Sequence, residues 1–271
     1  MNKLSKRKIY VLIPTHNRKE LLCSTLFSVS EQLSKNEITI VVVDAGSTDG
    51  TYDALSSKFP FVHIVKGHSD MWWTSSVNGG LNYIAQTASA GDRVLLMNDD
   101  IDLSEKALSN LLDASELNQR AIIGALNIVQ KPKEKPYVYF CGGKYDMYFA
   151  RHKSNISQGT PWDKTNKRFF ESDYLYGRLM LIPWEVFQLC GKFDEENFPQ
   201  YAADEDFTYR AKLQGFDILV DTLSMVYVNE ETTARFSLDY KRNGWRDFIN
   251  ALIFLLFNFI TITYMQIRLK P

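Results

Sequence analysis

Apolar residues in the first third of the chain alternate between short continuous runs and sets at helical spacing. Residues 9–13, 38–43 and 61–65 are compact apolar runs, and each predicts a short buried strand. Residues 19–33 place Leu and Val at helical spacing, and residues 52–59 are typical of a second helix. This alternation predicts an α/β fold with a mostly parallel sheet, flanked by helices and joined by right-handed crossovers.

A fourth apolar run leads directly into carboxylates. Residues 94–97 are apolar, and Asn98, Asp99 and Asp100 follow at once. An unpaired carboxylate is costly inside a strand, but it suits the carboxyl end of a strand in an open α/β sheet, where ligand sites form. There the two acids could hold a divalent cation, and the cation could hold a diphosphate. An acidic turn before a helix that begins near Ser104 is the alternative interpretation.

The first two strands also end in polar loops. Pro14 closes the first strand, and Asp44 closes the second, where its carboxylate could accept a hydrogen bond from the N–H of a pyrimidine base. The loop at residues 45–51 lacks the Gly-Lys-Ser/Thr ending of a P-loop, and it lacks the G-x-G-x-x-G spacing of a Rossmann dinucleotide site. Both of those nucleotide sites are therefore disfavoured.

Two adjacent tryptophans, Trp72 and Trp73, precede a segment with Asn78, Gly79 and Gly80, which we expect to open the helix before the fourth strand. Neighbouring side chains point to different sides of most local structures. We therefore expect one tryptophan to pack and the other to line a pocket, where its ring can stack on a base or a sugar. Burial of both rings in a hydrophobic interface is the alternative.

Apolar runs predict further strands in the second half of the chain. They lie at residues 137–144, where the strand should end in glycines, and at residues 176–182, 218–220 and 224–228. The polar residues 155–167 are expected to form a flexible loop over a site.

Three acids, Asp204, Glu205 and Asp206, lie in the first turn of a helix that we expect to end at Gln214-Gly215. Acids stabilise the N-terminus of a helix through its dipole, and this alone could explain them. One of the three could instead remove the proton from an acceptor hydroxyl.

Composition narrows the range of partners. The formal net charge of -1 argues against a protein that holds nucleic acid by electrostatic attraction. The three cysteines are odd in number and lack metal-ligand spacing, which is typical of reduced cysteines in an intracellular protein. No apolar signal core of the usual length follows the basic N-terminus, so we expect a cytoplasmic location.

Three segments together resemble the family 2 glycosyltransferases, which are inverting enzymes of the Rossmann-like GT-A fold. They are residues 10–18 (Tyr-Val-Leu-Ile-Pro-Thr-His-Asn-Arg), residues 43–51 (Val-Asp-Ala-Gly-Ser-Thr-Asp-Gly-Thr) and the Asn98-Asp99-Asp100 triplet. The resemblance implies transfer of a sugar from a nucleotide-diphosphate donor to a saccharide or lipid-linked saccharide. It implies donor contacts at Pro14, Thr15, Asn17, Arg18, Asp44, Trp73, Asn78, Gly79, Asn98 and Asp99.

Individual roles also follow from the resemblance. Asp44 and Thr15 would hold the nucleotide base, Asn98 and Asp99 the ribose region, and Asp100 an Mg²⁺ or Mn²⁺ ion. The family frequently has a histidine after its last strand, whereas this chain has Asn229, a weaker ligand. A protein ligand to the metal beyond Asp100 is therefore in doubt.

The acidic helix carries the implied catalytic base. Residues 191–195 (Gly-Lys-Phe-Asp-Glu) are similar to the G-x-F-D-E turn that precedes the catalytic helix of the family. The family often reads E-D-x-D-L-x-x-R, with the base six residues before the arginine. Counting back from Arg210 selects Asp204 and puts Asp206 at the second acid. Pairing Glu205-Asp206 with the E-D of the motif selects Asp206 instead, and we favour Asp204.

Other residues would serve the acceptor and the diphosphate. Gly177, Arg178 and Glu205 are the implied contacts, and a strand-edge ion pair is the alternative for Arg178. The Trp72-Trp73-Thr74 segment with Asn78-Gly79 also resembles a bacterial subgroup of rhamnosyltransferases. This likeness implies dTDP-L-rhamnose as donor and a cell-surface polysaccharide as product.

The composition changes after residue 234. Residues 248–265 carry no charge and are flanked by basic residues. At helical spacing, polar residues fall on one narrow face, which predicts a helix at residues 246–268 lying in a membrane interface, at the inner face of the cell membrane. Packing on the domain or on a second subunit in a homodimer is the alternative, and a transmembrane span is the third choice.

These observations predict a glycosyltransferase domain at residues 1–234 and a helical tail at residues 235–271. The domain would divide into a nucleotide-sugar half, residues 1–103, and an acceptor and catalytic half, residues 104–234. A sugar-phosphate nucleotidyltransferase should carry a glycine-rich loop after the first strand, and none is present. A non-catalytic sugar-nucleotide binder is the other alternative, and the presence of all the expected acids argues against it.

Overall fold

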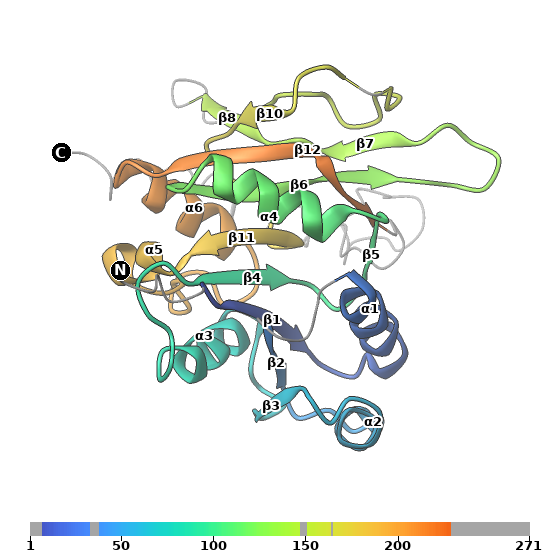
Figure 1. Cartoon of the computed structure of the whole chain (residues 1–271), viewed down its shortest axis with the longest axis vertical. Coiled ribbons are helices and arrows are strands. Elements are labelled where there is room, and N and C mark those ends of the chain that lie inside the picture. The colour runs from blue at the N-terminus through green and yellow to red at the C-terminus, as the bar shows by residue number, and fades with distance from the viewer. Residues whose placement is uncertain (1–6, 33–37, 147–150, 164, 229–271) are drawn as a thin grey trace, which may run out of the picture.

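The alternating segments build a mostly parallel sheet with helices on both faces (Figure 1). The computed structural model describes residues 7–32, 38–146, 151–163 and 165–228. Within these ranges the elements are β1 (Ile9–Thr15), α1 (Lys19–Gln32), β2 (Ile38–Asp44), α2 (Thr51–Lys58), β3 (His63–Lys66), α3 (Trp73–Ile84), β4 (Arg93–Met97), β5 (Ile101–Leu103), α4 (Ala107–Leu117), β6 (Ala121–Val129), β7 (Tyr137–Phe140), β8 (Gly143–Asp146), β9 (Arg151–Ser154), β10 (Phe169–Glu171), β11 (Leu179–Pro183), α5 (Trp184–Cys190), α6 (Ala203–Leu213) and β12 (Asp217–Val228).

The main sheet has the strand order β10-β12-β6-β11-β4-β1-β2-β3. Of these eight strands in the described part of the chain, six run in one direction, and β10 and β11 run against them. The reversed β11 lies between β4 and β6, so it joins the parallel strands of the first half to those of the second half. The expected parallel α/β arrangement is thus confirmed, with a reversed strand at its centre.

Side-chain alternation along the strands explains why both faces are covered. Tyr10 and Leu12 of β1 point into one apolar cluster with α3, α5 and α6, and Val11 and Ile13 point into another with α1, α2 and α4. Strands that are apolar on both faces require helices on both sides, which is the rule for parallel sheets. Gly80 of α3 faces β1, and its lack of a side chain lets this helix approach the sheet closely.

Several predicted boundaries change. The expected strand at residues 137–144 is two strands, β7 and β8, because Gly142 turns the chain with a φ of 72°. The two expected strands after residue 217 are one strand, β12, with an irregular register between Asp221 and Met225. Residues 78–80 lie within α3 rather than at its start, since this helix begins at Trp73.

Some elements are not among the predicted ones, although the residues of β6 form an apolar run of the kind that predicts a buried strand. The buried strand β6 is central to the sheet, and the β8–β9 hairpin forms a separate two-stranded sheet. The polar segment at residues 155–163 runs along β7, where Pro161 forms a bridge to Tyr137. It was expected to cover a site, but no residue of it lines the pocket described below.

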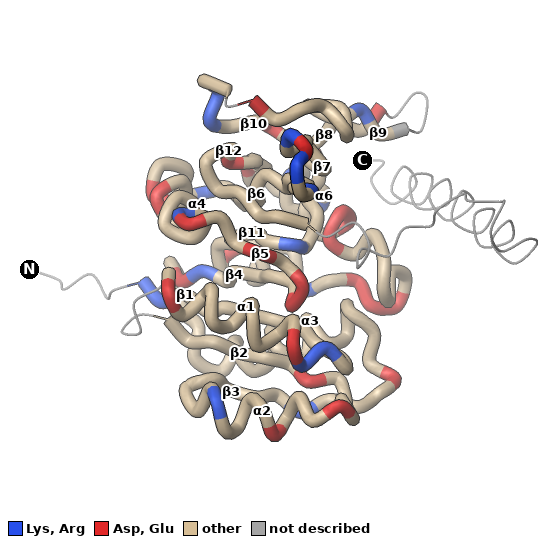
Figure 2. The backbone as a smooth tube through the Cα atoms, turned by 90° about the vertical axis from the view of Figure 1, so that its right-hand side faces the viewer, with Lys and Arg blue, Asp and Glu red and all other residues tan. Residues whose placement is uncertain are grey.

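The predicted tail at residues 235–271, its 246–268 helix and Asn229 lie outside the described residues. Among the helices that are described, none has the length and apolar character needed to cross a membrane. Figure 2 shows basic and acidic positions interspersed along the described backbone, in keeping with the net charge of -1.

Candidate active site

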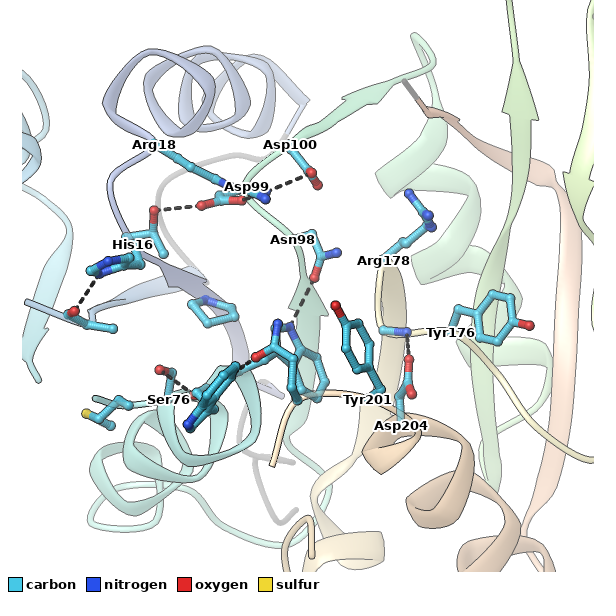
Figure 3. Close-up of a pocket in the computed structure, with 18 of the residues that line it drawn as sticks. His16, Arg18, Ser76, Asn98, Asp99, Asp100, Tyr176, Arg178, Tyr201 and Asp204 are labelled. Carbon is cyan, nitrogen blue, oxygen red and sulfur yellow. Dashed lines mark hydrogen bonds and ion pairs between the residues drawn. The ribbon is translucent and has the colours of Figure 1, made fainter. Parts of the chain in front are cut away.

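A large pocket opens at the carboxyl ends of β1 and β4 and extends to the N-terminus of α6. Its volume is about 940 Å³, and it is lined by residues of β1, α3 and α6, and by the segments that follow β4 and precede β11 (Figure 3). Of the ten predicted donor contacts, six line it, namely Pro14, Thr15, Arg18, Trp73, Asn98 and Asp99. The parallel strands thus bring together residues that are more than 80 positions apart in the sequence.

Asp99 and Asp100 form a network with the end of β1. The Thr15 hydroxyl donates to Asp99 Oδ2 at 2.6 Å. One guanidinium nitrogen of Arg18, Nη1, donates to both acids, to Asp99 Oδ1 at 3.1 Å and to Asp100 Oδ2 at 2.8 Å. Burial raises the pKa of Asp99, whereas the Thr15 hydroxyl and the charge of Arg18 act in the opposite direction. The Thr25 hydroxyl donates to the Asp99 carbonyl and fixes the backbone.

Asp100 retains one unused ligand atom. Its Oδ1 is buried and has no hydrogen-bond partner, although the residue lines the pocket. No cluster of three or more His, Cys, Asp or Glu side chains arranged for a metal occurs among the residues that the structure describes. A lone carboxylate oxygen fits a hard cation that takes its remaining ligands from phosphate oxygens and water. The residues present therefore fit Mg²⁺ or Mn²⁺ bound together with a diphosphate.

Asp44 and Asn17 brace the loops beside the pocket and do not line it. Asp44 Oδ1 accepts from the backbone N–H of Ser47 at 2.9 Å, and Asn17 Oδ1 accepts from that of Thr48 at 2.7 Å. Asn17 adopts a φ of 51°, a left-handed conformation that asparagine tolerates. The structure therefore places both residues as supports of the 45–51 loop.

The two neighbouring tryptophans, Trp72 and Trp73, differ in exposure and in contacts. Trp72 is 60% exposed, and it lies on the pocket wall at the start of α3. Trp73 also lines the pocket but is partly buried, with its ring edge-on to Phe193 and its Nε1 donating to Asn98 Oδ1 at 3.3 Å. The expectation that one ring packs while the other is presented to a ligand agrees with this arrangement, except that Trp73 does both.

Asn78 and Gly79 lie on α3 away from the pocket lining. The Asn78 amide donates to the Phe193 carbonyl at 2.9 Å and to Glu195 at 3.0 Å, and it accepts from the Phe193 N–H at 3.1 Å. Asn78 therefore holds the Gly-Lys-Phe-Asp-Glu turn against α3. The predicted donor contact becomes, in this structure, a support for the segment that leads into α6.

Asp204 lies at the N-terminus of α6 and lines the pocket. Its Oδ2 accepts from the Gly177 N–H at 2.6 Å, and Oδ1 accepts from the N–H of Glu205 at 3.0 Å. Burial raises the pKa of Asp204, and the backbone N–H donors and the charge of Arg178 act against this rise. The result is an oriented carboxyl group with enhanced basicity when ionised.

Glu205 also lines the pocket, next to the β8–β9 hairpin. Its Oε2 accepts from the Tyr145 hydroxyl at 3.2 Å and lies 3.7 Å from His152 Nδ1. Burial and the neighbouring charge of Asp204 raise the pKa of Glu205 to about 8. Glu205 is therefore largely protonated at neutral pH.

Asp206 turns away from the pocket. Its Oδ2 accepts from Arg210 Nε at 2.7 Å, and the same guanidinium donates to the carbonyls of Cys190 and Lys192 at 2.6 Å and 2.9 Å. Asp206 is 3% exposed and is absent from the pocket lining. The hydrogen bond from Arg210 to the Cys190 carbonyl ties α6 to the end of α5. The two candidate bases therefore differ in their surroundings.

Gly177 and Arg178 approach the pocket from the segment before β11. A Cβ at Gly177 would lie 2.8 Å from the Trp73 ring, so the tight contact requires glycine. The guanidinium of Arg178 stacks over the Tyr139 ring at 4.8 Å, and its backbone carbonyl accepts from the Asn98 N–H at 3.0 Å. Both residues line the pocket, and their role as contacts of a phosphate or an acceptor stays a prediction.

Sequence reasoning missed several lining residues, and four of them are aromatic: Tyr139, His152, Tyr176 and Tyr201. Tyr201 is 43% exposed at the pocket wall, just before the acidic helix, and its place next to the acids is a signal that could have been used. His152 lies on a short hairpin with no apolar pattern, so nothing in the local sequence indicates its role.

The family model described as Glycosyl transferase family 2 matches residues 10–173. The chain is 24% identical over 228 residues to N-acetylglucosaminyl-diphospho-decaprenol L-rhamnosyltransferase of Mycobacterium tuberculosis (strain ATCC 25618 / H37Rv), covering 74% of this chain and 70% of that protein.

Solved structures show the same fold at low sequence identity. GalNAc-T7 with UDP, GalNAc and Mn²⁺ has a TM-score of 0.63 at 16% identity, with 83% of this chain and 44% of that chain covered. The mannosyltransferase PcManGT from Pyrobaculum calidifontis, in complex with GDP-Man and Mn²⁺, has a TM-score of 0.58 at 17% identity. That match covers 86% of this chain and 60% of PcManGT, so the chain spans less than two thirds of either protein.

Proposed function

The chain belongs to glycosyl transferase family 2 and is a glycosyltransferase, and from this premise we propose a donor, an acceptor class and a set of catalytic residues. The reaction moves a sugar from a nucleotide-diphosphate sugar to the hydroxyl of a saccharide or lipid-linked saccharide, with inversion at the anomeric carbon. The observation that carries the proposal is that one pocket is lined both by the Asp99–Asp100 pair and by Asp204, on opposite sides.

The donor would bind at the carboxyl ends of β1 and β4. The nucleotide base would lie against Pro14, Ala45 and Trp72, which line this end of the pocket, while Asp44 braces the loop beneath it. Asn98 and Asp99 would face the ribose. In this proposal the predicted nucleotide-sugar half, residues 1–103, forms the donor side of the pocket.

The diphosphate would lie beside Asp100. A divalent cation there would neutralise charge on the departing diphosphate. The unpartnered Oδ1 of Asp100 supports this role, and two structural neighbours were crystallised with Mn²⁺. Gly177 and Arg178, which line the opposite wall, would contact the phosphate or the acceptor. Figure 3 shows Arg178 and Asp204 across the pocket from Asp99.

Asp204 would act as the general base. The acceptor oxygen attacks the anomeric carbon, the bond from that carbon to the phosphate oxygen breaks, and the nucleoside diphosphate leaves with the bonding electrons. The proton of the acceptor hydroxyl passes to Asp204. The Gly177 N–H holds Asp204 toward the pocket, and a protonated Glu205 would place no second negative charge beside it. One displacement at one face inverts the anomeric configuration.

The donor sugar and the product are a finer proposal. The relative from M. tuberculosis is named an N-acetylglucosaminyl-diphospho-decaprenol L-rhamnosyltransferase. This chain carries the Trp72-Trp73-Thr74 segment, whose resemblance to a rhamnosyltransferase subgroup implies the same sugar. We take dTDP-L-rhamnose as the first donor to test and a bacterial cell-surface polysaccharide as the product. Peripheral attachment to the membrane through residues 246–268 and a homodimer remain part of this proposal.

Titration calorimetry with dTDP and UDP, with and without Mn²⁺, tests the donor site. Asp100→Ala should abolish metal-dependent binding, whereas Asp206→Asn serves as the matched acidic control and should retain it. Failure of every nucleoside diphosphate to bind would overturn the assignment of this pocket as the donor site.

A donor panel tests the sugar. The purified chain is incubated with dTDP-L-rhamnose, UDP-GlcNAc, UDP-Gal and GDP-Man, and release of the nucleoside diphosphate is measured with Mn²⁺ present. Turnover of dTDP-L-rhamnose at least tenfold above the others is expected. Turnover of other donors alone would reject rhamnose and leave the glycosyltransferase assignment intact.

A further inference from the structure

Arg18 lies where a metal at Asp100 would have to compete with it. The Nη1 atom of Arg18 is 2.8 Å from Asp100 Oδ2 and 3.1 Å from Asp99 Oδ1, and both carboxylates are nearly buried, with side chains 8% and 6% exposed. Figure 3 shows the guanidinium between the two acids. Half of the Asp100 carboxylate is therefore already engaged by a cation of the protein itself.

The remaining half of Asp100 is not engaged. Its Oδ1 is buried without a hydrogen-bond partner, which is an unfavourable state for a carboxylate oxygen. A cation that approaches Oδ1 also approaches the guanidinium, because both oxygens belong to one small group. Two positive groups at that distance repel each other, and the partly buried surroundings screen the repulsion less than bulk water does.

A diphosphate changes this balance. The Arg18 side chain is 40% exposed and lines the pocket, so it is not locked on the acids from all sides. Phosphate oxygens are preferred partners of guanidinium groups. With a diphosphate beside the metal, Arg18 gains a second anionic partner, and its repulsion with the metal is offset.

We propose that Arg18 makes metal binding at Asp100 conditional on the nucleoside diphosphate. In the ligand-free protein Arg18 stands in for the metal, keeping Asp99 and Asp100 paired and oriented. The metal enters with the diphosphate, and Arg18 then shifts from Asp100 toward the phosphate oxygens. This inference rests on the proposed donor site, and it assigns Arg18 as a positioning residue that couples two ligands.

The coupling between metal and nucleotide can be measured as a change in the affinity for one caused by the other. If the nucleotide raises the affinity for metal by some factor, linkage requires the metal to raise the affinity for nucleotide by the same factor. Removing Arg18 should tighten the binding of metal alone and weaken the joint effect. A residue that merely held the acids in place would do the opposite, because its loss would loosen the metal site.

Mn²⁺ titration followed by electron paramagnetic resonance tests this without an activity measurement. Free Mn²⁺ is measured for the wild type, Arg18→Gln and Arg18→Lys, each alone and with saturating UDP or dTDP. In the wild type the nucleotide should tighten Mn²⁺ binding by at least roughly tenfold. Arg18→Gln should bind Mn²⁺ alone roughly five- to tenfold more tightly than the wild type, with the coupling reduced by a similar factor. Arg18→Lys, which keeps the charge, should stay close to the wild type.

Lys19→Gln is the matched control. It removes a positive charge from the next residue, the first of α1, and that ammonium group contacts the Asp49 carbonyl and Glu20 rather than the pocket acids. Its Mn²⁺ affinity should remain within about twofold of the wild type, as expected for a charge screened by solvent. An equal tightening in Lys19→Gln would attribute the effect to net charge and overturn the proposal.

Other outcomes also decide the question. If the wild type binds Mn²⁺ equally well with and without nucleotide, that result is enough to overturn the proposal. It does not depend on whether a variant folds. The proposal is also overturned if the Arg18→Gln protein, without nucleotide, binds Mn²⁺ no more tightly than the wild type does. Failure of both UDP and dTDP to bind the wild type, with or without Mn²⁺, overturns the donor site itself and this inference with it. Nucleotide binding that Mn²⁺ leaves unchanged overturns the coupling alone.

Discussion

Asp204→Asn and Asp206→Asn should have opposite effects, although the two acids are separated by a single residue. Asp204 faces the pocket and is held by the Gly177 N–H, whereas Asp206 is paired with Arg210 outside the pocket. Each substitution removes one negative charge and changes the shape of the side chain very little. Asp204→Asn should therefore abolish catalysis in a folded protein, and Asp206→Asn should weaken the fold of a protein that still works.

The magnitudes follow from the contacts. Loss of a general base lowers turnover by roughly 10²- to 10⁴-fold. The free energy of unfolding should change by less than about 1 kcal/mol for Asp204→Asn, because burial already disfavours the charged form of this group. For Asp206→Asn the buried ion pair is lost, but the amide oxygen can still accept from Arg210, so we expect a loss of about 2 kcal/mol. For a domain of this size that lowers the melting temperature by about 4–8 °C.

Three measurements on the same preparations separate the two residues. Thermal unfolding followed by circular dichroism gives the stability, and calorimetry with the preferred nucleotide and Mn²⁺ confirms an intact donor site. Turnover of the preferred donor, including hydrolysis to water, is then measured well below the lower melting temperature. The reasoning is refuted if Asp204→Asn keeps more than about a tenth of wild-type turnover, since a base contributes far more. Loss of turnover in a stably folded Asp206→Asn would move the base to Asp206.

Three further predictions concern stability and the pocket wall. Burial raises the folded-state pKa of Glu205 to about 8. Between this value and the ordinary pKa of about 4.3, the folded state holds a proton that the unfolded state has released. The free energy of unfolding therefore falls as the pH rises between those two values. Glu205→Gln should accordingly melt higher than the wild type at pH 9 and show a smaller difference at pH 5, and an equal difference at both values would exclude this cause. Gly80→Ala would place a Cβ 2.2 Å from Leu12 Cδ1, so we expect a loss of about 1–3 kcal/mol in a denaturant titration, and an unchanged midpoint would show that α3 can move away from the sheet. The Trp72 ring is 60% exposed, so Trp72→Ala should change the free energy of unfolding by no more than about 0.5 kcal/mol and raise the KM for the donor. Trp73→Ala should lower the free energy of unfolding by about 2–3 kcal/mol in the same titration. Equal losses for the two variants would contradict the division of roles.

The elements of the first half could be predicted because each is encoded locally. Apolar runs that end in a polar residue mark β1, β2 and β4, and the helical spacing of leucines marks α1. The same pattern placed Asp99 and Asp100 at a strand end, where a ligand site was expected. The first turn of α6 was also recognised, because three consecutive acids before an amphipathic segment favour the N-terminus of a helix.

The orientation of individual side chains could not be predicted in this way. Asn78 was assigned to the donor from its place in a motif, but α3 begins five residues earlier and turns Asn78 toward the Phe193 backbone. The hairpin β8–β9 brings His152 to Glu205, although neither strand has an apolar pattern. Contacts of this kind depend on how distant elements pack.

The sequence by itself determined the α/β class, the strand ends that carry the acids and the two candidate bases, because these depend on spacing within a single segment. Only the tertiary structure decided that Asp204 faces the pocket while Asp206 pairs with Arg210, and that Arg18 bridges Asp99 and Asp100. On a helix, residues two apart point to different sides, and which side faces a pocket is set by the neighbours. Those neighbours, from the Gly177 segment to the end of β1, come from parts of the chain that only folding brings together.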